Sequence, residues 1–301
     1  MKTAKQWRGS TGGTPLGQKL LLLMFRYIDL RTAYAIMAVV VPFYMLFHHR
    51  ATRAILHYFR QRRMMGPAQS LAHTYANHFM FGQMILDRFA VFSGCADIFR
   101  VNITGNEHFL RLASQPQGFI IAGAHIGNFE IAGYLLRQNL KPLHALVYPG
   151  ETKTVQRNRS RVLAQNNISL IPVAPDMSHL IAIRAALSAG GVVIMPADRM
   201  YGSSRSALVR FLGAPAHFPI GAASMAITFG VEILAVYAMK SSARRYDLRV
   251  IPIPTSFPGI TGKQERITAI TAAFAESMTA ALSSHPEQWF NYYPFWEGNS
   301  H

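Results

Sequence analysis

The chain lacks most features of secreted, metal-binding or nucleotide-using proteins. Its 301 residues include one cysteine, Cys95, which excludes an internal disulfide and fits a reducing compartment. No Cys/His spacing indicates zinc, and neither a Walker A loop nor a Gly-x-Ser-x-Gly elbow occurs. Residues 1–18 are polar and lack the pattern of a cleaved signal peptide, so we expect a loosely ordered start. Metal-dependent, nucleotide-dependent and serine-hydrolase chemistry are therefore not indicated.

Acidic residues are also scarce. There are 14 Asp and Glu against 30 Lys and Arg, which gives a formal charge of +16, while 50% of the residues are hydrophobic. Such a chain is not disordered and will be attracted to polyanions, either nucleic acid or an anionic membrane. No RNA-binding, zinc-finger or helix-turn-helix signature is found, so we predict no nucleic-acid partner and an anionic membrane surface instead.

The longest apolar stretch supports a membrane surface. Residues 32–47 are sixteen consecutive uncharged residues, which falls short of the roughly 20 that a perpendicular transmembrane helix needs. We predict a tilted or partly inserted membrane helix, with a buried core helix as the alternative. A basic flank follows directly, where it could meet anionic headgroups or form a solvated helix face. It consists of His48, His49, Arg50, Arg53, His57, Arg60, Arg62 and Arg63.

Short apolar runs alternate with amphipathic stretches in the order typical of βα units. The expected strands are 118–122, 142–148, 168–172, 192–196, 232–239 and 246–253, and the expected helices are 67–99, 128–138, 155–165, 177–189, 220–229 and 264–282, with a long loop over 202–218. We predict an α/β fold with a mixed, mostly parallel central sheet covered by helices and an N-terminal membrane-associated helical segment. Residues 1–66 would form that segment and residues 67–301 the main domain.

A histidine and an acid stand where a predicted strand gives way to a helix. His125 and Glu130 would project about 140° apart on a continuous helix and could not meet. If His125 lies in the turn and Asn128 caps the helix, however, Glu130 can reach back to the imidazole. Gly123 and Gly127 permit such a turn. A carboxylate on one ring nitrogen leaves the other to take a proton from a hydroxyl; the alternative is a core histidine bonded to a helix end.

The block GAHIGNFEIAG, residues 123–133, resembles the His-x4-Asp/Glu motif of the lysophospholipid acyltransferase superfamily, in particular its branch of bacterial lipid A late acyltransferases. Three further blocks carry the resemblance: Met195–Asp198 with Gly202 and Arg210–Gly213, then Ala222–Ala238, and Pro286–Trp289. It implies an O-acyltransferase that moves a fatty acyl group from acyl carrier protein or coenzyme A to a hydroxyl of a lipid or glycolipid. The expected location is the cytoplasmic face of the bacterial inner membrane.

The resemblance also implies roles for individual residues. His125 would be the general base and Glu130 its orienting partner, with backbone amides near the helix start stabilising the oxyanion. Phosphate of the acceptor or donor would be held by Arg159 or Arg161, unless these belong to a solvated basic helix. The remaining predicted substrate-binding residues are Asn128, Asp198, Arg199 and Arg210, and Asp198 matches an aspartate of the family's third block. No metal or bound cofactor is required.

The C-terminal segment departs from the family pattern. Lipid A enzymes commonly carry a basic His-Arg-Arg cluster after the Pro-Glu-Gln block, whereas this chain has Asn291–Trp296. The acceptor is therefore open between lipid A and an amino-acid lipid, a mannoside or a polyene lipid, and aminoacyl transfer is a further alternative. The late aromatic residues would lie at the bilayer interface or line the core. A non-catalytic lipid-binding protein on the same scaffold is the alternative from another class.

Overall fold

The computed structural model describes residues 28–92, 94–128, 131, 140–147, 168–174, 176–200 and 205–296. The expected helix over 155–165 lies outside these residues, as does most of the one over 128–138. The start of the chain, residues 1–27, lies outside them as well. The predicted division of the chain at residue 66 stays a prediction.

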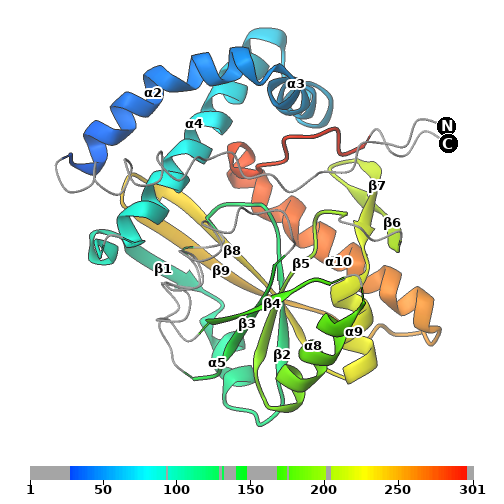
Figure 1. Cartoon of the computed structure of the whole chain (residues 1–301). Coiled ribbons are helices and arrows are strands. Elements are labelled where there is room, and N and C mark those ends of the chain that lie inside the picture. The colour runs from blue at the N-terminus through cyan, green and yellow to red at the C-terminus, as the bar shows by residue number, and fades with distance from the viewer. Residues whose placement is uncertain are drawn as a thin grey trace.

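One seven-stranded sheet forms the centre of the described structure, in the order β1-β9-β8-β2-β5-β3-β4 (Figure 1). All neighbouring strands are parallel except β8 and β9, which are antiparallel. This confirms the predicted mixed, mostly parallel sheet. The strands are β1 Arg100–Thr104, β2 Phe119–Gly123, β3 Leu143–Val147, β4 Ile168–Pro172, β5 Val192–Pro196, β8 Ile233–Ser242 and β9 Arg245–Ile253.

Helices cover both faces of the sheet, which explains why the central strands read as continuous apolar runs. All five residues of β2 are buried. Ile120 belongs to the core shared with α9 and α10, whereas Phe119 belongs to the core on the opposite face, where it packs edge-on against Phe109 of α5. The helices concerned are α5 Asn106–Ala113, α8 Ser178–Ser188, α9 Gly221–Phe229 and α10 Lys263–Ser284.

Three helical segments lie together along one side of the molecule, at the top of Figure 1: α2 Leu30–Phe47, α3 His49–His57 with the π-helical turn η1 Tyr58–Arg62, and α4 Pro67–Phe92. The Asp29 carboxylate caps α2 by accepting hydrogen bonds from the Arg31 and Thr32 amides, at 3.2 and 3.3 Å. The basic flank occupies α3 and η1, and most of its side chains are exposed.

Only one stripe of α2 is buried, and it packs against α4. The opposite face is apolar and exposed: Val39 is 66%, Leu46 74% and Phe47 79% exposed. The alternative of a buried core helix is therefore wrong. Among the described helices, α2 alone is long and apolar enough to cross a membrane.

Two expected elements are wrong. Residues 202–218 were expected to form a loop, but a hairpin occupies most of this stretch, with β6 Ser206–Phe211 paired to β7 Ala214–Pro219. Leu212 and Gly213 form its turn with φ of +48° and +81°, and buried and exposed residues alternate along both strands, as in a half-buried hairpin. The helix expected over 67–99 ends at Phe92, where the short helix η2 Ala96–Ile98 leads into β1.

The C-terminal aromatic residues line the core. Trp289 is 1% exposed and follows η3, Pro286–Gln288. Its ring packs edge-on against Tyr58, Phe211 and Trp296, with centroids 5.0 to 5.5 Å apart. Arg62 of the basic flank lies 4.8 Å above the Trp296 ring, a favourable cation–π distance. These two tryptophans therefore join the N-terminal segment, the hairpin and the C-terminus.

Candidate active site

His125 lies in a tight turn directly after β2. The turn needs glycine at position 127, where φ is +62° and a Cβ atom would stand 2.2 Å from the carbonyl oxygen of Ala238 on β8. That close approach brings the amide of Asn128 to the same oxygen, at 2.7 Å. The imidazole is thereby held at the carboxyl edge of the parallel strands, where sites of open α/β sheets lie.

Asp198 meets His125 from the neighbouring strand. β2 and β5 pair in register up to Gly123 and Pro196, and the amide of Ala197 donates to the Gly123 carbonyl at 2.8 Å. The two loops that follow therefore leave the sheet side by side. The Asp198 carboxylate accepts from the backbone amide of His125 at 2.8 Å and from its ring Nδ1 at 2.9 Å. Backbone and ring of the histidine are thus fixed by one carboxylate.

The electrostatics of this pair suit a base. Asp198 is 1% exposed. Burial opposes its ionisation, but the charge and hydrogen bonds of His125 and the charge of Arg199 outweigh burial and hold the pKa of Asp198 below its ordinary value. An ionised carboxylate only accepts, so ring Nδ1 is the donor of this hydrogen bond and carries a proton. The His125 side chain is 38% exposed, which leaves the ring within reach of a substrate.

The C-terminal segment supports the turn from the other side. The amide of Phe290 donates to the His125 carbonyl at 2.9 Å, and the amide of Gly127 donates to the Gln288 carbonyl at 2.8 Å. Arg199 follows Asp198 in the chain and donates to the carbonyl of Phe290. Its guanidinium is buried, which lowers the pKa of Arg199. The Pro-Glu-Gln-Trp block is therefore part of the framework that holds the histidine.

The chain is similar to known proteins. The family model described as bacterial lipid A biosynthesis acyltransferase matches residues 74–297, which include the histidine turn, Asp198 and the C-terminal block. The chain belongs to this acyltransferase family. This family membership confirms the resemblance seen in the sequence blocks.

Two more distant relatives were found. A phosphatidylinositol mannoside acyltransferase of Mycolicibacterium smegmatis is 22% identical over 199 residues, 65% of this chain and 62% of the relative. A protein of the same name from Mycobacterium tuberculosis is 21% identical over 195 residues, 64% of this chain and 59% of the relative. The similarity thus spans about three fifths of the length of these relatives.

The structure describes only some of the other predicted site residues. Glu130, Arg159 and Arg161 lie outside the described residues, so their roles stay predictions. Arg210 lies on the exposed outer face of the β6–β7 hairpin. Arg199 contacts the C-terminal segment, as described above. Substrate binding by both described arginines likewise stays a prediction.

Asn128 is 6% exposed, and its side chain is engaged within the protein. Its Nδ2 donates to the Met84 carbonyl at 3.3 Å and to the Tyr246 hydroxyl at 3.1 Å, while its Oδ1 accepts from the Ile131 amide at 3.3 Å. These contacts support the predicted helix cap. They favour a positioning role over direct substrate binding, which stays a prediction.

The amides of the turn are also engaged. Those of His125, Gly127 and Asn128 donate to protein oxygens at 2.7 to 2.8 Å. They are therefore not free to stabilise an oxyanion. A small apolar cavity of about 10 Å³ lies nearby, and its lining includes Ala122 and Ala197, each next in sequence to a residue of the site region. No cluster of metal-ligating side chains occurs among the described residues.

Sequence reasoning did not predict the contact between His125 and Asp198. It paired the histidine with Glu130, which is near in sequence, whereas Asp198 is 73 residues away. A signal was present: both residues follow short buried strands, and adjacent parallel strands place such residues at one edge. What the sequence did not reveal was that β2 and β5 are neighbours in the sheet.

Proposed function

We propose that this protein is an O-acyltransferase that moves a fatty acyl group from a thioester donor to a hydroxyl of a lipid or glycolipid acceptor. The observation that carries the proposal is the hydrogen bond from His125 Nδ1 to the buried Asp198 carboxylate at 2.9 Å. It orients a partly exposed imidazole whose Nε2 can accept a proton. Membership of a lipid acyltransferase family supports the same chemistry.

In the proposed reaction, Nε2 of His125 removes the proton of the acceptor hydroxyl as its oxygen attacks the thioester carbonyl carbon. Asp198 stabilises the imidazolium that forms and keeps the ring in one tautomer. The tetrahedral intermediate then collapses, the carbon–sulfur bond breaks, and the imidazolium returns the proton to the leaving thiolate. Donors other than the amides of His125, Gly127 and Asn128 must stabilise the oxyanion, because those three are already engaged.

The reaction type suggests the acyl donor, and the names of the family and of the two relatives suggest the acceptor. We propose acyl carrier protein or coenzyme A as the thioester carrier. The family description names lipid A and the two relatives are named for phosphatidylinositol mannoside, so a glycolipid hydroxyl is the acceptor that these likenesses favour. The apolar face of α2 and the basic residues of α3 support work at an anionic membrane surface, which we assign to the cytoplasmic face of the inner membrane.

Lipid mass spectrometry of cells with and without the gene tests this function. Expression of the wild type should add one acyl chain to a lipid class, with a mass gain that names both chain and acceptor. His125→Ala should abolish the gain. His108→Ala is the matched control, because the His108 side chain is also 38% exposed but lies on α5. It should leave the lipids as in the wild type.

Purified protein separates the remaining alternatives. Acyl-carrier-protein and coenzyme A thioesters are offered in parallel with the acceptor found in cells, and release of free thiol is followed. If His125→Ala supports the same lipid change as the wild type while remaining folded, the catalytic proposal fails. In that case a non-catalytic lipid-binding protein is the better description.

A further inference from the structure

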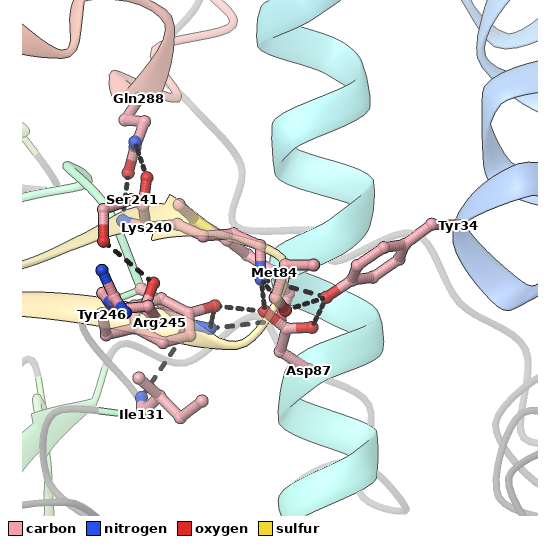
Figure 2. A network of polar contacts seen from close by, with 11 residues as sticks. Tyr34, Met84, Asp87, Ile131, Lys240, Ser241, Arg245, Tyr246 and Gln288 are labelled. Atoms are coloured by element: carbon pink, nitrogen blue, oxygen red, sulfur yellow. Dashed lines mark hydrogen bonds and ion pairs between the residues drawn. The ribbon is translucent and has the colours of Figure 1, made fainter. Parts of the chain in front are cut away.

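A buried ion pair joins α4 to β8. Asp87 on α4 is 0% exposed and Lys240 on β8 is 3% exposed, and Nζ of the lysine donates to the carboxylate. Figure 2 shows that three side chains reach the Asp87 carboxylate: Tyr34 from α2, Lys240 from β8 and Tyr246 from β9. The two members of the pair are 153 residues apart in the chain.

Every proton of this cluster has an acceptor. Besides Asp87, Lys240 Nζ donates to the Tyr34 hydroxyl and to the Ala243 carbonyl, both at 3.0 Å. The carboxylate also accepts from the hydroxyls of Tyr34 and Tyr246. A cluster that is closed to solvent and satisfied internally offers no vacancy for a ligand.

Stability alone does not account for such a pair. Burial raises the pKa of Asp87 and lowers that of Lys240, since it disfavours the charged form of each. Removing two charges from water costs several kcal/mol per ion, and well-packed apolar replacements are often no less stable. A buried pair of this kind is better explained by the geometry that it imposes on its neighbours.

That geometry leads directly to the histidine turn. Burial and the nearby Asp87 charge raise the pKa of Tyr246 well above its ordinary value, so the phenol keeps its proton. The proton is donated to Asp87, and the same oxygen must therefore accept from Nδ2 of Asn128, at 3.1 Å. The carboxylate thus fixes the Tyr246 hydroxyl as an acceptor, and the hydroxyl orients the residue that ends the His125 turn.

A second connection runs through the backbone of Lys240. Its amide donates to Oε1 of Gln288 at 2.8 Å, and its carbonyl accepts from Nε2 of Gln288 at 2.7 Å. The Gln288 carbonyl in turn accepts from the amide of Gly127 at 2.8 Å. Lys240 is therefore connected to the histidine turn twice: its side chain through Asp87, Tyr246 and Asn128, and its backbone through Gln288.

We propose that Asp87, Lys240 and Tyr246 are positioning residues for His125: they hold Asn128, and through it the turn that aims the imidazole. The inference rests on the proposed function in assigning the imidazole a reaction. It adds that α4 and β8, neither of which carries the base, determine where the base points. Tyr34 donates to Oδ1 of Asp87, whereas Tyr246 donates to Oδ2, so Tyr34 lies outside the route from Asp87 through Tyr246 to Asn128.

Two conservative variants test the proposal. Tyr246→Phe and Tyr34→Phe each remove one buried hydroxyl that donates to Asp87, but only the first removes one of the two acceptors of Asn128 Nδ2, the other being the Met84 carbonyl. We expect Tyr246→Phe to lower kcat about 10- to 100-fold with KM changed less than about 3-fold, because misplacement of a reacting group by about 1 Å can cost that much. Tyr34→Phe should retain kcat within about 3-fold. Equal kcat values in the two variants overturn the proposal.

A second measurement does not depend on activity. The rate at which diethyl pyrocarbonate modifies His125 is read by mass spectrometry, with His108 of equal exposure as the internal reference. Tyr246→Phe should change the ratio of the two rates, and Tyr34→Phe should not. If the wild type transfers no acyl group but the ratio changes in Tyr246→Phe as expected, the proposed function is wrong and the proposed positioning role is still supported. An unchanged ratio overturns the positioning even in an active enzyme.

The double variant Asp87→Leu with Lys240→Met covers the case in which Tyr246→Phe does not fold. It removes both charges together, so neither is left buried and unpaired, and we expect a folded protein whose melting temperature is at or somewhat below that of the wild type, because the buried hydroxyls of Tyr34 and Tyr246 lose the Asp87 acceptor. The Tyr246 hydroxyl then has no carboxylate to donate to. We expect the same loss of kcat, and wild-type kcat in this folded double variant would refute the proposal.

Discussion

Gly127 offers the sharpest test of how the histidine turn is built. Its φ of +62° carries a cost of about 1–2 kcal/mol for any residue with a Cβ. In addition, the Cβ of alanine would lie 2.2 Å from the Ala238 oxygen, where ordinary contact begins at 3.4 Å, so the turn must move by about 1 Å. That movement breaks the 2.7 Å hydrogen bond from the Asn128 amide, which leaves buried polar groups unpaired.

The loss of that hydrogen bond adds about 1–3 kcal/mol. With the backbone strain, Gly127→Ala should lower the free energy of unfolding by about 2–5 kcal/mol. A shift of this size at His125 should lower acyl transfer about 100-fold or more. Denaturant unfolding followed by circular dichroism measures the first quantity, and thiol release from the donor measures the second.

Gly230 provides a matched control. Its φ is +63°, but nothing lies within 4 Å of a Cβ placed there. Gly230→Ala should therefore show the backbone cost alone, about 1–2 kcal/mol, and normal transfer. If the two variants unfold at the same denaturant concentration and are equally active, the close approach between the turn and β8 does not matter as argued.

Three further outcomes are expected. Asp198→Asn should lower kcat about 10³- to 10⁴-fold with the fold intact by circular dichroism, because an amide can donate to Nδ1 of His125 and favour the wrong tautomer. Trp289→Ala should lower the free energy of unfolding by about 3–5 kcal/mol, measured by urea denaturation, because a large core side chain is lost. Arg111→Ala should cost no more than about 1 kcal/mol at neutral pH and less in high salt, since the ion pair with Glu232 is half-exposed. Because the hydrogen bond from Arg111 lowers the pKa of Glu232, this small difference should be present above the ordinary pKa of a glutamate and vanish as the pH falls through the lowered value, which the same denaturation in acid measures.

The apolar helix α2 and the site are connected through α4. Helix α2 packs on α4, which carries Asp87. Two hydrogen bonds, from Tyr246 to Asp87 and from Asn128 to Tyr246, connect Asp87 to the histidine turn. The same helix contacts the C-terminal block through Asn77, whose Nδ2 donates to the Glu287 and Trp289 carbonyls at 2.8 and 2.9 Å. The N-terminal helices therefore help to fix both sides of the site as well as presenting an apolar face.

Local patterns in the sequence predicted much of the fold. Five of the six expected strands between 118 and 253 both begin and end within one residue of those observed, because short apolar runs bounded by turn residues depend on nearby residues only. The hairpin β6–β7 was missed although its alternation was visible, since Pro215 and Pro219 read as loop residues. β1 was missed because an edge strand of five residues with a weak pattern resembles a loop.

The sequence by itself determined that His125 stands in a glycine turn at the end of a buried strand, next to a helix start, because those properties reside in a dozen consecutive residues. It also determined that an apolar helix with a basic flank precedes the strands of the sheet. Only the tertiary structure decided that the Asp198 carboxylate accepts a hydrogen bond from the His125 ring. The same holds for the hydrogen bonds of Gln288 and Phe290 to the turn, and for the ion pair between Asp87 and Lys240. Each of these contacts joins segments far apart in the chain, and their proximity follows from strand order, which no local pattern specifies.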